Sequence, residues 1–209
     1  MIEFKLNNQT VQAQEGESIL KAAQRHGVDI PHLCYTDGLR ADGNCRACVV
    51  EIKGERTLAP SCCRAATAGL EVLVSDRAVK SQKMVLEMLL SDMPDAGYKW
   101  SDKGQHGELS DWASRMDVQV RPALHALRRE QPACDVSHPA MAVNLDACIQ
   151  CNRCARACRE EQVNDVIGYA HRGAHSQIVF DLNDAMGNSS CVACGECVQA
   201  CPTGALMPK

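Results

Sequence analysis

Apolar and polar positions near the N-terminus alternate in a way that predicts a small sheet with one helix packed across it. Asn7 and Asn8 form a turn signal between the first two strand patterns. Ser18 precedes a short apolar run and suits the N-cap of a helix over residues 19–23, which Gly27 ends. The strands are expected at residues 2–6, 10–13, 49–52 and 70–74.

Helical spacing of apolar residues follows and predicts a helix over residues 77–92. From residue 93 to about 140 the chain is polar and interrupted by prolines, with short helices expected at 108–116 and 123–129. Further on, residues 167–169 and 177–181 are expected to pair as a small hairpin.

The amino-acid composition is unusual for a soluble domain. Cysteines make up 14 of the 209 residues, while aromatic residues are few. Five cysteines lie between positions 34 and 63, none between 64 and 133, and nine between 134 and 201. We expect a cytoplasmic protein, since the chain shows neither a signal-peptide pattern nor an apolar run long enough to span a membrane. Disulfides are rare in that compartment, so the thiols are expected to be metal ligands. The net charge of −4 argues against a nucleic-acid partner.

The strongest motif is a repeat of C-x2-C-x2-C-x3-C, once from Cys148 to Cys158 and once from Cys191 to Cys201. This spacing is typical of [4Fe–4S] ligands, and in two-cluster ferredoxins the fourth cysteine of each run binds the other cluster. Two [4Fe–4S] clusters are therefore predicted. The first takes Cys148, Cys151, Cys154 and Cys201, and the second takes Cys158, Cys191, Cys194 and Cys197.

The N-terminal cysteines predict one further cluster. Their spacing resembles the plant-type [2Fe–2S] pattern with a wider first gap, and the expected ligands are Cys34, Cys45, Cys48 and Cys62. Four-thiolate zinc sites are the alternative for each of these motifs, and buried free thiols are a further alternative for the N-terminal one. Cys63, beside Cys62, is an alternative fourth ligand. Otherwise Cys63 and Cys134 are interpreted as structural or free thiols. No catalytic residues are predicted, and the seven histidines show no ligand-spaced motif.

These motifs predict an α+β fold in three parts. A β-grasp [2Fe–2S] ferredoxin-like domain is expected over residues 1–76, a helical connector over 77–140, and a bacterial-ferredoxin-like domain with two [4Fe–4S] clusters over 141–209.

The order of these parts resembles the N-terminal iron–sulfur region of the α subunit of NAD-dependent formate dehydrogenases that contain molybdenum or tungsten. It is also similar to the diaphorase small subunit of NAD-reducing hydrogenases and to the N-terminal part of the large iron–sulfur subunit of complex I. The stretches that carry the resemblance are IPHLCYTDGLRADGNCRACVVEI, LDACIQCNRCARACREEQVNDVIGYAHRGAHSQIVFDLND and SSCVACGECVQACPTGALMPK.

The chain departs from this family in the connector. The family holds another [4Fe–4S] cluster there with one His and three Cys, whereas the matching stretch of this chain, residues 93–116, has Met93 near the place of the His and no cysteine. We expect that cluster to be missing, whatever the role of His106. The chain also stops at Lys209, before the family's molybdopterin domain, and is expected to be a small subunit or an excised portion.

The resemblance implies an electron-transfer subunit that is not catalytic alone. It would relay electrons between a molybdopterin-containing formate dehydrogenase unit and an NAD(H)- and FMN-binding flavoprotein. The alternatives are a free-standing ferredoxin-type carrier with several clusters, a diaphorase small subunit of an NAD-reducing hydrogenase, and a zinc-binding interaction module.

Overall fold

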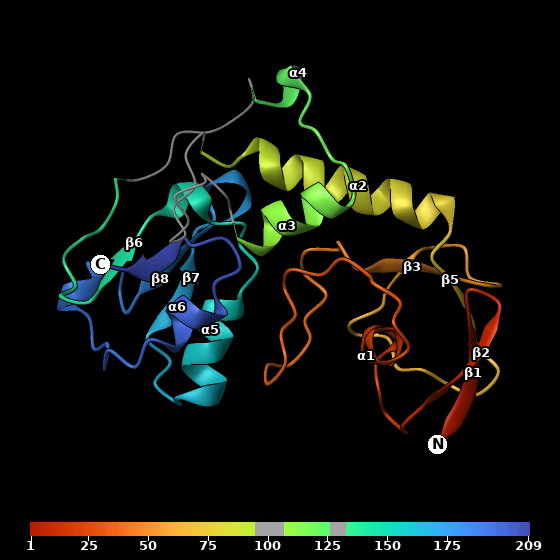
Figure 1. Cartoon of the computed structure of the whole chain (residues 1–209). Coiled ribbons are helices and arrows are strands. Elements are labelled where there is room, and N and C mark those ends of the chain that lie inside the picture. Colours follow the sequence, from red (N-terminus) through yellow and green to blue (C-terminus); the bar gives the residue numbers. More distant parts are fainter. Residues whose placement is uncertain (95–106, 126–132) are drawn as a thin grey trace. The chain divides into compact units, whose positions relative to one another are not determined.

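The computed structural model describes residues 1–94, 107–125 and 133–209 (Figure 1). The chain divides into two compact units of mixed helix and strand content, which agrees with the α+β prediction. One unit comprises Met1–Tyr35 and Ala41–Leu86, and the other comprises Thr36–Arg40 and Glu87–Lys209.

The first unit is built on a five-stranded mixed sheet in the order β2-β1-β5-β3-β4. Strand β1 pairs antiparallel with β2 and parallel with β5, so the N-terminal strand lies inside the sheet. The four predicted strands are confirmed, whereas β4 was not predicted because it has two residues and includes a proline. The strands are β1 (Ile2–Leu6), β2 (Gln9–Ala13), β3 (Val49–Ile52), β4 (Ala59–Pro60) and β5 (Glu71–Leu73).

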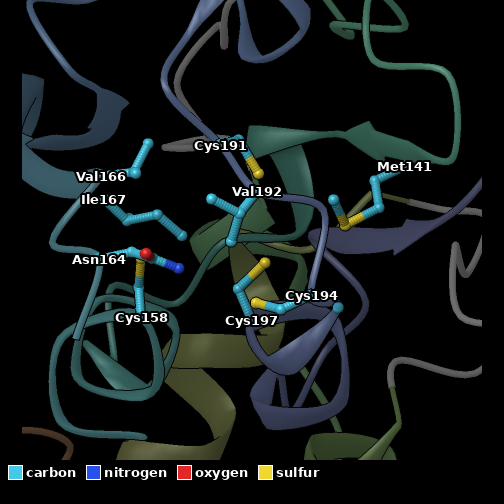
Figure 2. Close-up of a pocket in the computed structure, with 10 residues that line it drawn as sticks. Met141, Cys158, Asn164, Val166, Ile167, Cys191, Val192, Cys194 and Cys197 are labelled. Atoms are coloured by element: carbon cyan, nitrogen blue, oxygen red, sulfur yellow. The ribbon is translucent and has the colours of Figure 1, made fainter. Parts of the chain in front are cut away.

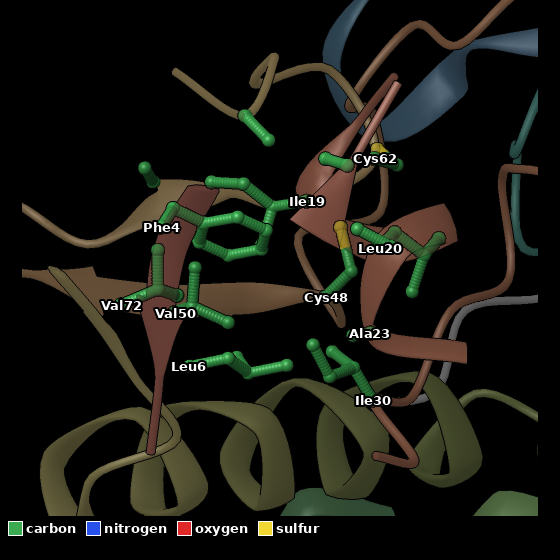
Figure 3. Packing of buried hydrophobic residues seen from close by; sticks show 14 of the residues in the cluster. Phe4, Leu6, Ile19, Leu20, Ala23, Ile30, Cys48, Val50, Cys62 and Val72 are labelled. Atoms are coloured by element: carbon green, nitrogen blue, oxygen red, sulfur yellow. The ribbon is translucent and has the colours of Figure 1, made fainter. Parts of the chain in front are cut away.

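Helix α1 (Ile19–Arg25) packs its apolar face into the core of this unit. The Ser18 hydroxyl accepts a hydrogen bond from the backbone N–H of Lys21 at 3.2 Å, which confirms the predicted N-cap. Figure 3 shows the side chains of this core, with Phe4 and Leu20 among them. Cys48 and Cys62 belong to the same buried cluster, so part of the first cysteine motif is held by packed apolar residues.

Helix α2 (Asp76–Ser91) begins in the first unit and ends in the second, close to its predicted bounds. The Gln82 amide is buried and donates a hydrogen bond to the carbonyl of Val49 at 2.8 Å. Met93, which follows the helix, is buried as well. The short helix α3 (Glu108–Arg115) is confirmed, while only Pro122–His125 of the second predicted helix is described, as α4. Residues 126–129 of that prediction and His106 lie outside the described residues.

The second unit joins the two cysteine motifs through short strands and turns. The predicted hairpin is present as β7 and β8, and an unpredicted pair, β6 and β9, joins the chain before the first motif to the chain after the second. Its elements beyond α4 are β6 (Met141–Val143), η1 (Leu145–Ala147), α5 (Arg153–Arg156), η2 (Ala157–Glu161), β7 (Ile167–Ala170), η3 (Gly173–His175), β8 (Gln177–Phe180), η4 (Met186–Asn188), α6 (Glu196–Ala200) and β9 (Leu206–Pro208).

Candidate metal centres

Three thiols of the second motif share a cavity with one thiol of the first. Cys191, Cys194 and Cys197 line it from the loop before α6 and from its first turn, and Cys158 lines it from η2 (Figure 2). The remaining wall is largely apolar and includes Met141, Val166, Ile167 and Val192. The structure thus brings together the four cysteines that were predicted to share one cluster.

A second cavity has the reciprocal composition. It is lined by Cys148, Cys151 and Cys154 of the first motif and by Cys201 of the second. Thr203 helps to hold Cys201 there: its hydroxyl donates to the Ala147 carbonyl at 2.5 Å, and its oxygen lies 3.8 Å from the Cys201 sulfur. The other lining residues are mostly apolar or aromatic, and they include Ile149, Tyr169, Ile178 and Leu206.

Both ligand loops have the same backbone geometry. Gln150 and Asn152 of the first motif have φ of 54° and 65°, and the equivalent Ala193 and Gly195 have φ of 58° and 83°. Left-handed residues in such loops turn successive N–H groups toward one side and so form a concave site for an anion. One of these N–H groups contacts a thiol: the Ala193 N–H donates to the Cys191 sulfur at 3.4 Å. Both loops therefore fit a group that carries negative charge on sulfur.

The N-terminal thiols lie close together in the first unit. Cys34, Cys48 and Cys62 are buried and Cys45 is partly buried. The Cys34 N–H donates to the Cys45 sulfur at 3.4 Å, and Arg46, beside Cys45, has a left-handed φ of 59°. This loop repeats the features of the C-terminal loops, namely inward thiols, a left-handed residue and an N–H directed at sulfur.

Burial and mutual contact shift the pKa values of these thiols. Burial, followed by the negative charges of neighbouring cysteines, raises the pKa of Cys151 and Cys154, and the same causes raise the pKa of Cys197 to about 12. Hydrogen bonds from the Cys45 and Cys62 thiols lower the pKa of Cys34 to about 2 and raise the pKa of those two donors. A bound metal cation would supply the positive charge that makes a full set of thiolates favourable, with release of protons.

The two remaining cysteines lie on the surface. The Cys63 sulfur is 3.6 Å from the Cys62 sulfur, and Cys63 is exposed. Cys134 is also exposed, and its pKa is raised by partial burial and by Asp135. The sequence reasoning missed the buried Arg153 and Arg156, although both lie inside the first motif and have no basic equivalent in the second.

Comparison with known proteins identifies the class. Residues 1–77 match the family model of a 2Fe-2S iron-sulfur cluster binding domain, and residues 140–202 match that of a 4Fe-4S dicluster domain. The chain therefore has an N-terminal domain of the 2Fe-2S type and a C-terminal domain of the 4Fe-4S dicluster type. No helix among the described residues is both long enough and apolar enough to cross a membrane.

Its relatives are oxidoreductase subunits. The chain is 32% identical to the NADP-reducing hydrogenase subunit HndD of Solidesulfovibrio fructosivorans, over 99% of this chain and 36% of the relative. It is 33% identical to an NADH-quinone oxidoreductase subunit of Rhizobium meliloti strain 1021, over 99% of this chain and 24% of the relative. The chain thus spans about a quarter to a third of these curated relatives.

A solved structure matches over a larger share of its own length. A chain in the crystal structure of NAD+-reducing [NiFe]-hydrogenase in the H2-reduced state superposes with a TM-score of 0.85 at 27% identity. The match covers 100% of this chain and 87% of the hydrogenase chain.

Proposed function

We propose that this chain is an electron-transfer subunit that relays electrons between an NAD-linked flavoprotein and a catalytic oxidoreductase partner. The observation that carries the proposal is the presence of three groups of four thiols on a fold that matches most of a chain from an NAD+-reducing hydrogenase. We infer no catalytic residue in this chain, and its function is to hold and tune redox centres.

The proposed cofactors are one [2Fe–2S] and two [4Fe–4S] clusters, which supply one-electron transfer when bound. The first unit would hold the [2Fe–2S] cluster and the second unit both [4Fe–4S] clusters, with the fourth cysteine of each motif crossing to the other cluster. The ligand sets are Cys34, Cys45, Cys48 and Cys62; Cys148, Cys151, Cys154 and Cys201; and Cys158, Cys191, Cys194 and Cys197.

The chain's own residues have three tasks in this relay. The thiolates fix each centre, and the N–H groups of the left-handed loops donate hydrogen bonds that stabilise charge on sulfur. Apolar walls such as Ile178 and Leu206 keep water out, so that neighbouring charges act on the cluster with little screening.

The identity of the catalytic partner is the more specific part of the proposal. The sequence resemblance alone supports a molybdenum or tungsten formate dehydrogenase. The structural match supports a partner of the NAD-reducing hydrogenase type, and the flavoprotein partner is common to both. We therefore propose the NAD-linked flavoprotein as the first partner to test.

Affinity purification of the tagged chain from its native host, under anaerobic conditions, tests the subunit proposal. The expected result is co-elution of a flavoprotein together with a protein that contains molybdenum, tungsten or nickel, identified by mass spectrometry and metal analysis. Molybdenum or tungsten with formate-dependent NAD+ reduction supports a formate dehydrogenase, and nickel with H2-dependent reduction supports a hydrogenase. A chain that elutes alone, with its clusters and diffusion-limited reduction by a foreign diaphorase, supports the free-standing carrier instead.

A further inference from the structure

The two halves of the cysteine repeat differ in charge at equivalent positions. The residue before the third cysteine is Arg153 in the first motif and Glu196 in the second, and the residue two positions after it is Arg156 in the first and Gln199 in the second. Both arginines are buried, whereas Glu196 is partly exposed and Gln199 is exposed. The two halves of the repeat therefore share their cysteines but differ in the charge around them, so the two cluster environments are unequal.

Arg153 lies between two ligands of the first cavity, Cys151 and Cys154. Its side chain is 3% exposed, and its Nη1 donates to a Glu108 carboxylate oxygen at 2.6 Å. The Glu108 side chain is 40% exposed, so water screens the carboxylate more than it screens the guanidinium. The Glu108 N–H also donates to the carbonyl of Pro202, the residue after Cys201, at 2.9 Å. The start of α3 therefore contacts both chain segments that supply thiols to this cavity.

Arg156 is 2% exposed and directs its donors at backbone carbonyls of the same loop. Its Nη2 donates to the Cys151 carbonyl at 3.4 Å and its Nε donates to the Asn152 carbonyl at 3.3 Å. Its Nη1 donates to the carbonyl of Arg40, in the segment Thr36–Arg40 that belongs to this unit. The guanidinium is thus fixed behind the loop that carries Cys148, Cys151 and Cys154.

We propose that Arg153 and Arg156 are positioning residues for the cluster held by Cys148, Cys151, Cys154 and Cys201, and that their buried charges raise its reduction potential. This inference rests on the proposed function, because it requires that the cluster is bound. A cluster with four thiolates is anionic and gains one more negative charge on reduction, and a nearby fixed cation stabilises the reduced form more than the oxidised form.

Burial alone acts in the opposite direction on this cluster. Three of its four thiols are buried and Cys148 is partly exposed. In the other set Cys158 and Cys197 are buried, Cys191 is partly exposed and Cys194 is exposed, so the first set is the more buried of the two. A buried anion loses hydration, which disfavours its reduction, while the more exposed cluster keeps the help of water. Both arginines lie beside the more buried set of thiols. We infer that their positive charges offset the lowering of the reduction potential that burial of the first cluster causes.

The test is a redox titration of the full chain, monitored by EPR, on Arg153→Gln, Arg156→Gln, Arg156→Lys and Glu108→Gln. We expect one of the two [4Fe–4S] midpoint potentials to fall in both Gln variants of the arginines while the other stays in place. Arg156→Lys keeps the charge and should restore the potential, and Glu108→Gln should raise it. Gln199→Met is the matched control at the equivalent position of the second motif, and it should move neither potential.

Iron and sulfide analysis distinguishes failure of the proposed function from failure of the inference about the arginines. If the unmodified chain binds no [4Fe–4S] cluster, the proposed function fails before the arginines are tested. If all variants keep both clusters and neither midpoint potential moves, the inference about the arginines is overturned while the proposed function stands. If an arginine-to-Gln variant loses a cluster, the other two variants decide. A raised midpoint potential in Glu108→Gln and an unchanged one in Arg156→Lys support the inference. An unchanged midpoint potential in Glu108→Gln overturns it.

Discussion

The exchange of the fourth ligand between the two motifs can be tested by double substitution. Cys148 and Cys201 line one cavity, although they are 53 residues apart, whereas Cys191 and Cys201 line different cavities within one motif. Alanine is the suitable replacement because it cannot bind iron. Each single substitution removes one ligand and is expected to cost one cluster, or about four iron.

The double variants then separate the two assignments. If Cys148 and Cys201 serve the same cluster, as we propose, Cys148→Ala/Cys201→Ala should lose about four iron in total and leave about six of about ten. Cys191→Ala/Cys201→Ala removes one ligand from each cluster and should lose about eight iron, leaving about two. The assay is iron and acid-labile sulfide per chain on anaerobically purified protein, with circular dichroism to show that each variant is folded. The reverse pattern, about eight lost in the first double variant and about four in the second, would refute the crossed assignment.

Three further variants test individual features. Cys62→Ala should abolish the visible absorption and EPR signal of the [2Fe–2S] cluster while Cys63→Ala leaves both unchanged; a signal that disappears only in Cys63→Ala would assign the fourth ligand to the neighbouring thiol. Ser18→Ala removes the N-cap of α1 and should cost about 1 kcal/mol, seen as a lower thermal midpoint; an unchanged midpoint would mean that the cap contributes nothing. Gly187→Ala would place a Cβ 2.5 Å from the Ser137 carbonyl oxygen, so it should destabilise the second unit by about 1–3 kcal/mol, and wild-type stability would show that this contact relaxes freely.

Cysteine spacing carried most of the information about the candidate sites. It grouped the twelve thiols into three sets of four, and the structure brings the two C-terminal sets together in separate cavities. Cysteine spacing could predict these sets because three closely spaced cysteines must lie on one short segment. Ligation of clusters by these sets stays a prediction that the iron analysis tests.

Features that depend on distant pairing could not be predicted in the same way. Strands β6 and β9 have three residues each and are separated by more than sixty positions, so neither has a recognisable local pattern. The buried Arg153 guanidinium pairs with Glu108, which lies on a different helix. The buried Arg156 guanidinium donates to the carbonyl of Arg40, which is more than a hundred residues away in the sequence. A basic residue in a short polar segment is predicted to be exposed unless these partners are known.

The proposed electron-transfer function is tested most directly by EPR spectroscopy of the dithionite-reduced chain, combined with iron, sulfide and zinc analysis of the same anaerobic sample. This function predicts about ten iron per chain, with one slowly relaxing [2Fe–2S] signal and two fast-relaxing [4Fe–4S] signals. Little iron, stoichiometric zinc and no EPR signal would contradict it, because the chain would then have no redox centre through which electrons could pass.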